Sequence, residues 1–231
     1  MQTFLESYYD IFIDLFTRVQ LIQDNPMRAY EECLIIQQML IQRIMEVESE
    51  ILEAKHQITE SKRLLTERQT KDKAKVIKSR INSLHRLIDE FKYVLSVFRS
   101  VGDALIFTYI ERWDIKPIAF KESPGFLTGK EGFKEELRIL KEWFDKKKIA
   151  IMNDLTNNMR FGDITVIDDF HQFSLIEVKS GAQKFKAHKK QTNKRLKLES
   201  YLETDKVEDL HYTGQNMLRI SAHSPLGVSR K

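Results

Sequence analysis

The chain of 231 residues is 42% hydrophobic and 31% charged, and its formal net charge is +4. This composition supports a packed core and excludes a wholly disordered chain. The single cysteine, Cys33, excludes an internal disulfide and a cysteine-rich zinc site. Because no apolar run could span a bilayer and the first residues lack a signal-peptide pattern, we expect a soluble, cytoplasmic protein with no membrane partner.

The first half of the sequence has three helical patterns. Apolar side chains recur three and four residues apart over residues 2–22, which predicts an amphipathic helix that ends at residues 24–26. A second pattern, over residues 26–68, has no Gly or interior Pro and predicts a long helix. A third helix is expected to follow the charged segment 69–73 and to end near residue 113.

The second and third helices have matching heptad seams. The first seam consists of Leu40, Ile44, Val47, Ile51, Ala54, Ile58, Ser61 and Leu65. The second consists of Ile77, Ile81, Leu84, Ile88, Phe91, Leu95, Phe98 and Gly102. A turn near residue 71 pairs positions such as Ile51 and Phe91, so the seams predict an antiparallel coiled-coil hairpin about 60 Å long. We expect this arm to be either a solvated structural extension or a surface for a protein partner or self-association.

A break in the helical pattern divides the chain into two predicted domains. Pro117 and the segment 123–125 (Ser-Pro-Gly) are typical of a loop. We therefore expect residues 1–116 to form a helical arm with its coiled-coil turn near 69–73, and residues 117–231 to form a second domain.

A β-hairpin is the central feature of the second domain. Residues 161–167 and 173–181 are rich in β-branched and aromatic residues and flank a short polar tip. Antiparallel pairing about the tip places Asp163 opposite Glu177, with Lys179 on the same side. Because opposed like charges are destabilising, a divalent cation held by these oxygens would relieve the repulsion, and the register alone predicts a metal site.

The elements around the hairpin complete an α+β or α/β arrangement. A helix is expected over residues 129–148 and a first strand over 149–152. After the hairpin, a helix is expected over 181–202, a short strand near 210–212 and a weaker one over 216–221. The order helix, three strands, helix, strand predicts an α/β sandwich of about 100 residues.

The hairpin motifs resemble those of a known nuclease family. Gly162-Asp163-Ile164, followed by Ile-Glu-Val-Lys-Ser-Gly at residues 176–181, is similar to the signature of the PD-(D/E)XK superfamily, which has the restriction-endonuclease-like αβββαβ fold. The resemblance covers about residues 125–213 and not the coiled-coil arm. Gly162 stands where the motif name has proline.

The resemblance implies specific roles for the hairpin residues. Asp163 and Glu177 would bind Mg²⁺ or Mn²⁺ with the backbone carbonyl of Val178, and Lys179 would orient or activate the attacking water. Phosphodiester cleavage independently needs a Lewis acid and a positioned water, and hard carboxylate ligands suit Mg²⁺. The Glu-x-Lys spelling also occurs twice in the coiled-coil pattern, so an inactive binding relative and coincidence remain as alternatives.

The family often adds an acidic residue from the first helix, and three candidates are present. Glu131, Glu135 and Glu136 lie around Phe133, which begins the apolar face of that helix. At 100° per residue only Glu136 is directed toward the sheet. A solvated surface glutamate is the more usual reading for each of them.

The predicted helix after the motif is strongly basic. Such a stretch beside a nuclease motif would follow a phosphate backbone, although a solvated helix face is the alternative. The glutamine in it matches a position where several branches of the superfamily place one near the site. The predicted nucleic-acid-binding residues are Lys184, Lys186, Lys189, Lys190, Gln191, Lys194, Arg195 and Lys197.

Two other motif types fail on spacing. Residues 125–130 are one residue short of a phosphate-binding loop and lack the following Ser or Thr. The histidines have no metal-ligand spacing.

The sequence thus predicts a Mg²⁺- or Mn²⁺-dependent deoxyribonuclease on a coiled-coil arm. Endo- and exonuclease action both stay open, and an effector role in bacterial defence against foreign DNA is one hypothesis. The rival hypothesis is a non-catalytic coiled-coil assembly protein whose nuclease-like domain binds nucleic acid or a protein partner.

Overall fold

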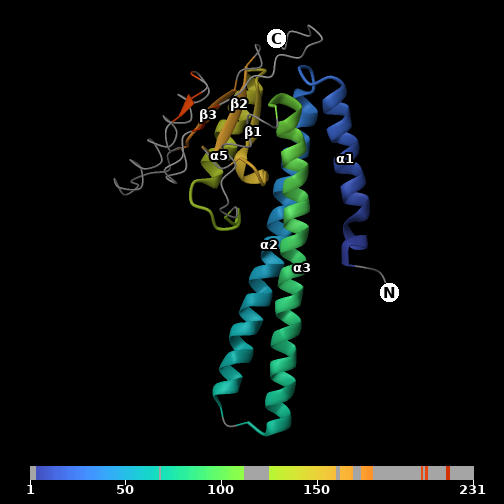
Figure 1. Ribbon diagram of the computed structural model, residues 1–231, viewed down its shortest axis with the longest axis vertical. Coiled ribbons are helices and arrows are strands. Elements are labelled where there is room, and N and C mark those ends of the chain that lie inside the picture. Colours follow the sequence, from blue (N-terminus) through green and yellow to red (C-terminus); the bar gives the residue numbers. More distant parts are fainter. Residues whose placement is uncertain are drawn as a thin grey trace.

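The computed structural model describes residues 4–67, 69–111, 125–159, 162–168, 173–178, 204, 206–207 and 217–218 (Figure 1). The described helical elements are η1 (Phe4–Tyr8), α1 (Tyr9–Asp24), α2 (Tyr30–Thr66), α3 (Lys71–Tyr109), α5 (Phe133–Asp145) and η2 (Asn153–Leu155). The strands are β1 (Ile149–Met152), β2 (Ile164–Ile167), β3 (Phe173–Ile176), β4 (Lys206–Val207) and β5 (Met217–Leu218). None of the described helices is both long and apolar enough to cross a membrane.

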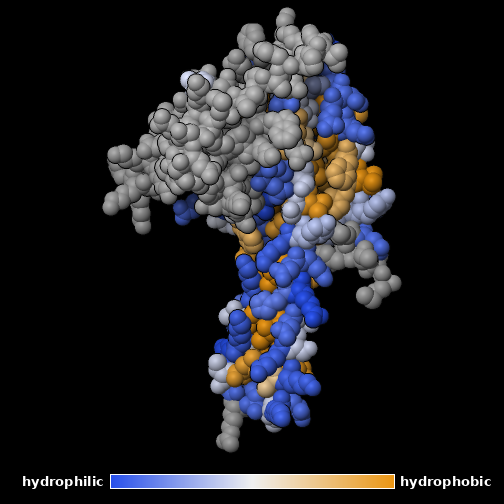
Figure 2. Space-filling model, viewed as in Figure 1, coloured by the Kyte–Doolittle hydropathy of each residue, from blue (hydrophilic) through white to orange (hydrophobic). Residues whose placement is uncertain are grey.

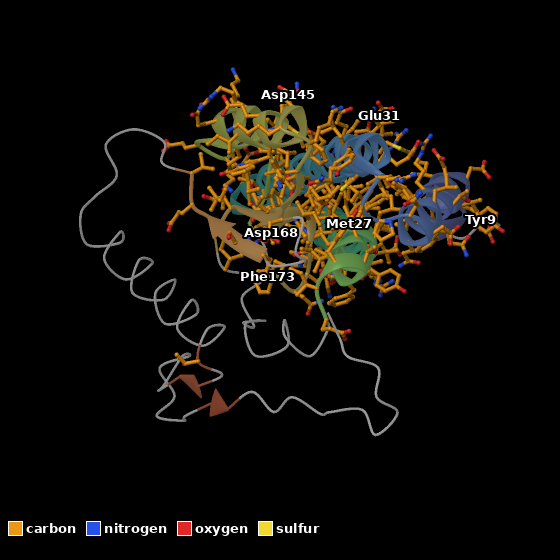
Figure 3. The ribbon with its side chains drawn as sticks, turned by 90° about the horizontal axis from the view of Figure 1, so that it is seen from above. Tyr9, Met27, Glu31, Asp145, Asp168 and Phe173 are labelled. Carbon is orange, nitrogen blue, oxygen red and sulfur yellow. The ribbon has the colours of Figure 1, made fainter. Side chains whose placement is uncertain are left out.

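Helices α2 and α3 form the long antiparallel hairpin that the heptad seams predict (Figure 1). The turn lies between Thr66 and Lys71, at the expected place. Both seams are buried except at Leu65, Ile77 and Leu84, which are half-buried. Helix α1 and the sheet lie on opposite sides of this helix pair (Figures 1 and 3).

A glycine allows the sheet region to approach the arm closely. A Cβ atom added at Gly102, two turns before the end of α3, would lie 1.9 Å from the backbone oxygen of Leu155 in η2. Only a residue without a side chain fits there, which explains a glycine inside a helix that it would otherwise destabilise.

Strands β1, β2 and β3 form an antiparallel sheet in that order. The ladder pairs Ile167 with Phe173 and Ile164 with Ile176, which confirms the predicted hairpin register. Every residue of β1 and β2 is buried, and α5 and α2 both contact β1. The sheet is therefore part of a continuous core that also includes the proximal half of the arm, which is the half of the α2–α3 hairpin that contacts the sheet.

A side chain from α2 forms hydrogen bonds with the outer edge of β1, the edge that does not face β2. The Gln37 carboxamide donates to the carbonyl of Ala150 (2.8 Å) and accepts from the backbone N–H of Met152 (2.9 Å). Gln37 is fully buried. Its amide replaces a neighbouring strand and satisfies backbone groups that an exposed edge would leave open.

The fold class is α+β, as one of the predicted options states. The predicted first strand, residues 149–152, coincides with β1. Strands β4 and β5 pair with each other in a separate two-stranded sheet, and β5 lies within the weak strand expected over 216–221. The helix expected over 181–202 and the strand near 210–212 lie outside the described residues.

Candidate active site

Asp163 lies directly before β2, and its backbone is hydrogen-bonded to residues of η2 and β3. Its backbone N–H donates to the carbonyl of Ile176 (2.8 Å), and its carbonyl accepts from the N–H of Asn153 (2.9 Å). The carboxylate Oδ2 accepts from the backbone N–H of Val178 at 2.7 Å. These bonds orient the carboxylate, and its Oδ1 lies 3.6 Å from Nζ of Lys130.

Gly162 has a backbone conformation that explains the departure from the family motif. Its φ is +69°, a region that favours glycine, and an added Cβ would lie 3.0 Å from the Ile176 carbonyl oxygen. Proline has φ fixed near −65° and could not replace it here. The turn before Asp163 thus requires glycine where the motif name has proline.

Of the three candidate glutamates, only the one predicted to face the sheet is buried, as helical geometry predicts. Glu136 is 3% exposed, whereas Glu131 is exposed and Glu135 is paired with Arg138 at the surface. Both oxygens of Glu136 contact the Lys130 ammonium, at 2.8 and 2.9 Å. Helical geometry therefore identified the glutamate that contacts Lys130, whose ammonium also lies near Asp163.

Lys130 is the centre of a cluster of three carboxylates. Its Nζ lies 2.6 Å from Asp154 Oδ2 and 2.8 Å from Glu136 Oε1, in addition to the contact with Asp163. Burial lowers the pKa of Lys130, but hydrogen bonds and charge from Asp154 and Glu136 outweigh this effect and raise the pKa above its ordinary value. The ammonium is therefore charged at all physiological pH values.

Burial raises the pKa of the Glu136 carboxyl, and the negative charges of Asp163 and Asp154 raise it further, while Lys130 opposes the shift. Three carboxylates share one cation at this place. Three acidic side chains thus meet one basic side chain in a half-buried setting.

The arm holds the loop that contains Lys130. The carboxylate of Glu48 in α2 is fully buried and accepts from the backbone N–H groups of Leu127 (3.1 Å) and Thr128 (2.8 Å). Arg99 of α3 donates to Glu48 (3.3 Å) and to the carbonyl of Gly125 (3.1 Å). Helices α2 and α3 thus fix the residues that lead into Lys130.

Asn153 connects the end of β1 with the start of β2. Its side-chain amide donates to the Gly162 carbonyl at 3.2 Å, and its side-chain oxygen accepts from the Thr165 hydroxyl at 2.6 Å. Since Asp154 is the next residue, these two hydrogen bonds also place Asp154 close to Asp163.

The predicted carboxylate pair is arranged differently from the simple register. The ladder ends at Ile164 and Ile176, and Asp163 bonds the Val178 N–H, while Glu177 is half-buried after the end of β3. Within the described residues, no group of three or more His, Cys, Asp or Glu side chains is arranged to hold a metal ion. The roles of Asp163, Glu177 and Val178 as ligands stay predictions.

Several predicted site residues cannot be placed. Lys179 lies outside the described residues, as does the whole predicted nucleic-acid-binding set: Lys184, Lys186, Lys189, Lys190, Gln191, Lys194, Arg195 and Lys197.

Lys130 and Asp154 were not among the predicted site residues. Lys130 ends the segment 125–130, whose spacing does not match a phosphate-binding loop. A signal for Asp154 was available: it follows the first strand closely, and in an antiparallel pair the end of one strand lies beside the start of the next. Lys130 has no comparable local signal, because its position depends on the contacts of Glu48 with residues distant in sequence.

No protein-family model, no curated protein and no solved structure matches the chain. The resemblance to PD-(D/E)XK nucleases therefore rests on the residues described above.

Proposed function

We propose that the protein is a metal-dependent nuclease that hydrolyses phosphodiester bonds of DNA, with a restriction-endonuclease-like domain docked on a coiled-coil arm. One observation supports this most: Glu136 from α5 and Asp163, directly before β2, converge on a single cationic nitrogen. The two residues belong to the helix and strand that the family resemblance assigns to the site. The role in defence against foreign DNA remains a hypothesis of the sequence.

The donor set at this place suits Mg²⁺ or Mn²⁺. Hard carboxylate oxygens from Glu136 and Asp163 lie around one positive charge, and Mg²⁺ is commonly held by one or two carboxylates plus water and substrate phosphate. Under the resemblance, Glu177 and the Val178 carbonyl would add further oxygens. The ion would supply a Lewis acid for the phosphoryl oxygen.

Lys130 has two effects in this proposal. Its ammonium occupies the space between Glu136 and Asp163, so it competes with a divalent cation for the same oxygens. Its contact with Asp154, the shortest of the three at 2.6 Å, can persist when the other two carboxylates bind an ion. Lys130 then stays beside the phosphate as a fixed positive charge, and Lys179 keeps the role of orienting the attacking water.

Cleavage of supercoiled plasmid with Mg²⁺ or Mn²⁺ tests the function. Asp163→Asn, Glu136→Gln and Lys179→Met should each lower the rate by at least about 100-fold. Glu135→Gln is the matched control on the same helix, and its rate should equal that of the wild type because Glu135 forms a surface ion pair with exposed Arg138. Equal nicking by all variants, or none by the wild type, would contradict the proposal.

The rival function is a non-catalytic binding protein in which the Lys130 cluster is only structural. The observation in its favour is that Lys130 already neutralises part of the carboxylate charge. Thermal unfolding with added Mn²⁺ separates the two, since a ligand of the folded state alone stabilises it by about 2.7 kcal/mol at 100 times its Kd. The nuclease is favoured if Mn²⁺ raises the Tm of the wild type, leaves that of Asp163→Asn unchanged, and raises that of Lys130→Met by more than that of the wild type. If Mn²⁺ raises the Tm of none of these proteins, the rival is favoured.

A further inference from the structure

The far end of the α2–α3 hairpin concentrates the positive charge of the chain. Residues 61–88, here called the basic tip, contain nine Lys or Arg and two acidic residues, a net charge of +7. The rest of the chain has 29 basic and 32 acidic residues, a net charge of −3. The basic residues of the tip are Lys62, Arg63, Arg68, Lys71, Lys73, Lys75, Lys78, Arg80 and Arg86.

The tip projects from the rest of the molecule. The end of the hairpin extends away from α1, α5 and the sheet (Figure 1), and hydrophilic side chains surround its narrow apolar seam (Figure 2). The lysines at the start of α3, Lys71, Lys73, Lys75 and Lys78, are all exposed. In the part of the chain that the structure describes, none of these four has an acidic partner within 4.0 Å.

The local placement of these charges opposes helix stability. Thr70 caps α3, and its side chain accepts from the backbone N–H of Lys73. Lys73 therefore occupies the third helical position, where a glutamate would complete a capping box with Thr70. Lys71 and Lys73, in the first turn, also oppose the helix dipole by about 0.3–1 kcal/mol each, whereas Asp72 in the same turn favours it.

Among the described residues these four cations have no acidic partner, and their like charges repel one another, which points to an external polyanion. The contacts described above offer the four lysines no gain within the molecule, whereas a row of phosphates would interact favourably with each of them. The acidic residues of the hairpin lie mainly nearer the sheet, where Glu46, Glu48, Glu50 and Glu53 occupy a single stretch of α2. The tip is therefore the part of the arm that an anionic partner would select.

We propose that the basic tip binds the phosphate backbone of nucleic acid, as a contact site separate from the candidate active site. The choice of nucleic acid over another polyanion rests on the proposed function. Helical rise from Lys73 to Gly102, where α3 meets η2, gives a separation of about 44 Å. At 3.4 Å per base pair, a duplex of roughly 13 base pairs covers that distance. The arm then acts as a second grip on the nucleic acid on which the sheet domain acts.

Binding measured without divalent cations tests the tip independently of cleavage. A fluorescent DNA duplex of about 30 base pairs is titrated in EDTA with full-length protein, at several salt concentrations. In the variant Lys71→Gln/Lys73→Gln/Lys75→Gln/Lys78→Gln, affinity at low salt should fall at least about tenfold, and the slope of log K against log salt should decrease by about 3. The matched control replaces the same four lysines with arginine and should bind like the wild type. Circular dichroism checks that the helical content of both variants is unchanged.

Three outcomes would overturn the tip proposal. The first is a glutamine variant with wild-type affinity and salt slope. The second is an arginine variant that loses binding as the glutamine variant does, since charge would then not be the determinant. The third is a tip-dependent interaction with vesicles of anionic phospholipid together with tip-independent binding of the duplex. Plasmid cleavage is scored separately. Loss of cleavage in Asp163→Asn together with tip-dependent duplex binding supports both proposals. Cleavage by the wild type that is lost in Asp163→Asn, together with tip-independent duplex binding, overturns only the tip proposal.

Discussion

The two ends of the α2–α3 hairpin are stabilised by different kinds of contact. At the distal end the buried side chains form a narrow apolar seam, with Ser61 as a small polar exception. At the proximal end, where the sheet packs, the helices also bury polar and charged side chains: Gln37, Glu48, Arg99 and Asp103. The same pair of helices is therefore a simple coiled coil at one end and a specific platform at the other.

The polar residues of the platform bind backbone groups that are distant in sequence. Gln37 pairs the edge of β1, Glu48 holds the loop before Lys130, and Asp103 accepts from the N–H groups of Asn157 and Asn158. A buried polar group is costly unless it is hydrogen-bonded, so each of these contacts fixes one position of the sheet region. The distal end has no such contact within the described residues and is left available for another molecule.

The largest expected effect comes from removal of the buried charge at the platform. Glu48→Ala removes the carboxylate that pairs with Arg99, whose side chain is 6% exposed, and leaves two backbone N–H groups without their acceptor. We expect the free energy of unfolding to fall by about 3–5 kcal/mol, measured by urea denaturation. The control Glu50→Ala, on an exposed position of the same helix, should change it by less than about 0.5 kcal/mol. Similar values for both variants would mean that the platform contributes no more than the solvated face.

The distal arm could be predicted from the sequence because its contacts repeat. Seam residues such as Ile51 and Ile58 recur every three or four positions, and an antiparallel turn satisfies both seams at once. The hairpin register of β2 and β3 was also predictable, since side chains that alternate faces allow few registers. The platform was less accessible: Gly102 is read as an ordinary seam position, although its role is the close approach to Leu155.

The candidate site was predictable only where one local rule applied. Helical geometry identified Glu136, and the strand pattern identified Asp163. Lys130 could not be found in this way, because its ammonium reaches the cluster through a loop that the arm holds. Strand alternation also did not predict the bond between the Asp163 carboxylate and the Val178 N–H, or the left-handed turn at Gly162.

The second prediction concerns the ion cluster that depends on the platform. Lys130→Met removes the ammonium that Glu136, Asp154 and Asp163 share, and the free energy of unfolding at neutral pH should fall by about 2–3 kcal/mol. Without the cation, the already raised pKa of Glu136 rises further, so the folded variant binds more protons than its unfolded chain. The stability of the variant should therefore increase as the pH falls from 8 to 5, and its deficit against the wild type should shrink.

The wild type should lose stability at high pH, where Lys130 loses its proton. The pKa of Lys130 is raised in the folded state, so its stabilising contribution is present at neutral pH and is lost as the pH rises above the ordinary lysine value. Urea denaturation across pH measures both trends, with Lys134→Met at an exposed position of α5 as the control. A deficit in Lys130→Met that stays constant between pH 8 and pH 5 would contradict the shared-cation description.

The third prediction compares two small-residue changes on one helix. Gly102→Ala places a Cβ against the backbone of Leu155, which cannot move aside as a flexible side chain could, and should cost about 1–3 kcal/mol. Ser83→Ala, at an exposed position of the distal arm, should be neutral or slightly stabilising because alanine has the higher helix propensity. Thermal unfolding of both variants measures the contrast, and a stabilised Gly102→Ala would show that α3 and η2 are not in close contact.

The smallest expected effect has opposite signs in stability and in binding. Lys73→Glu completes the capping box with Thr70 and places a negative charge at the N-terminal end of α3, so the free energy of unfolding should rise by about 0.3–1 kcal/mol. The same change should weaken duplex binding in EDTA, because one cation of the tip becomes an anion. The control Lys92→Glu, near the middle of α3, lies outside the basic tip and should lower stability slightly through its contact with Asp89, with a smaller effect on binding.

If Lys73→Glu both stabilised the fold and left the salt dependence of binding unchanged, the lysine at this position would have no function in nucleic-acid contact. A gain in stability together with a loss of affinity would instead mean that Lys73 lowers local helix stability and contributes to contact with an external anion. The platform differs, because the buried charges of Glu48, Arg99 and Asp103 are hydrogen-bonded within the chain.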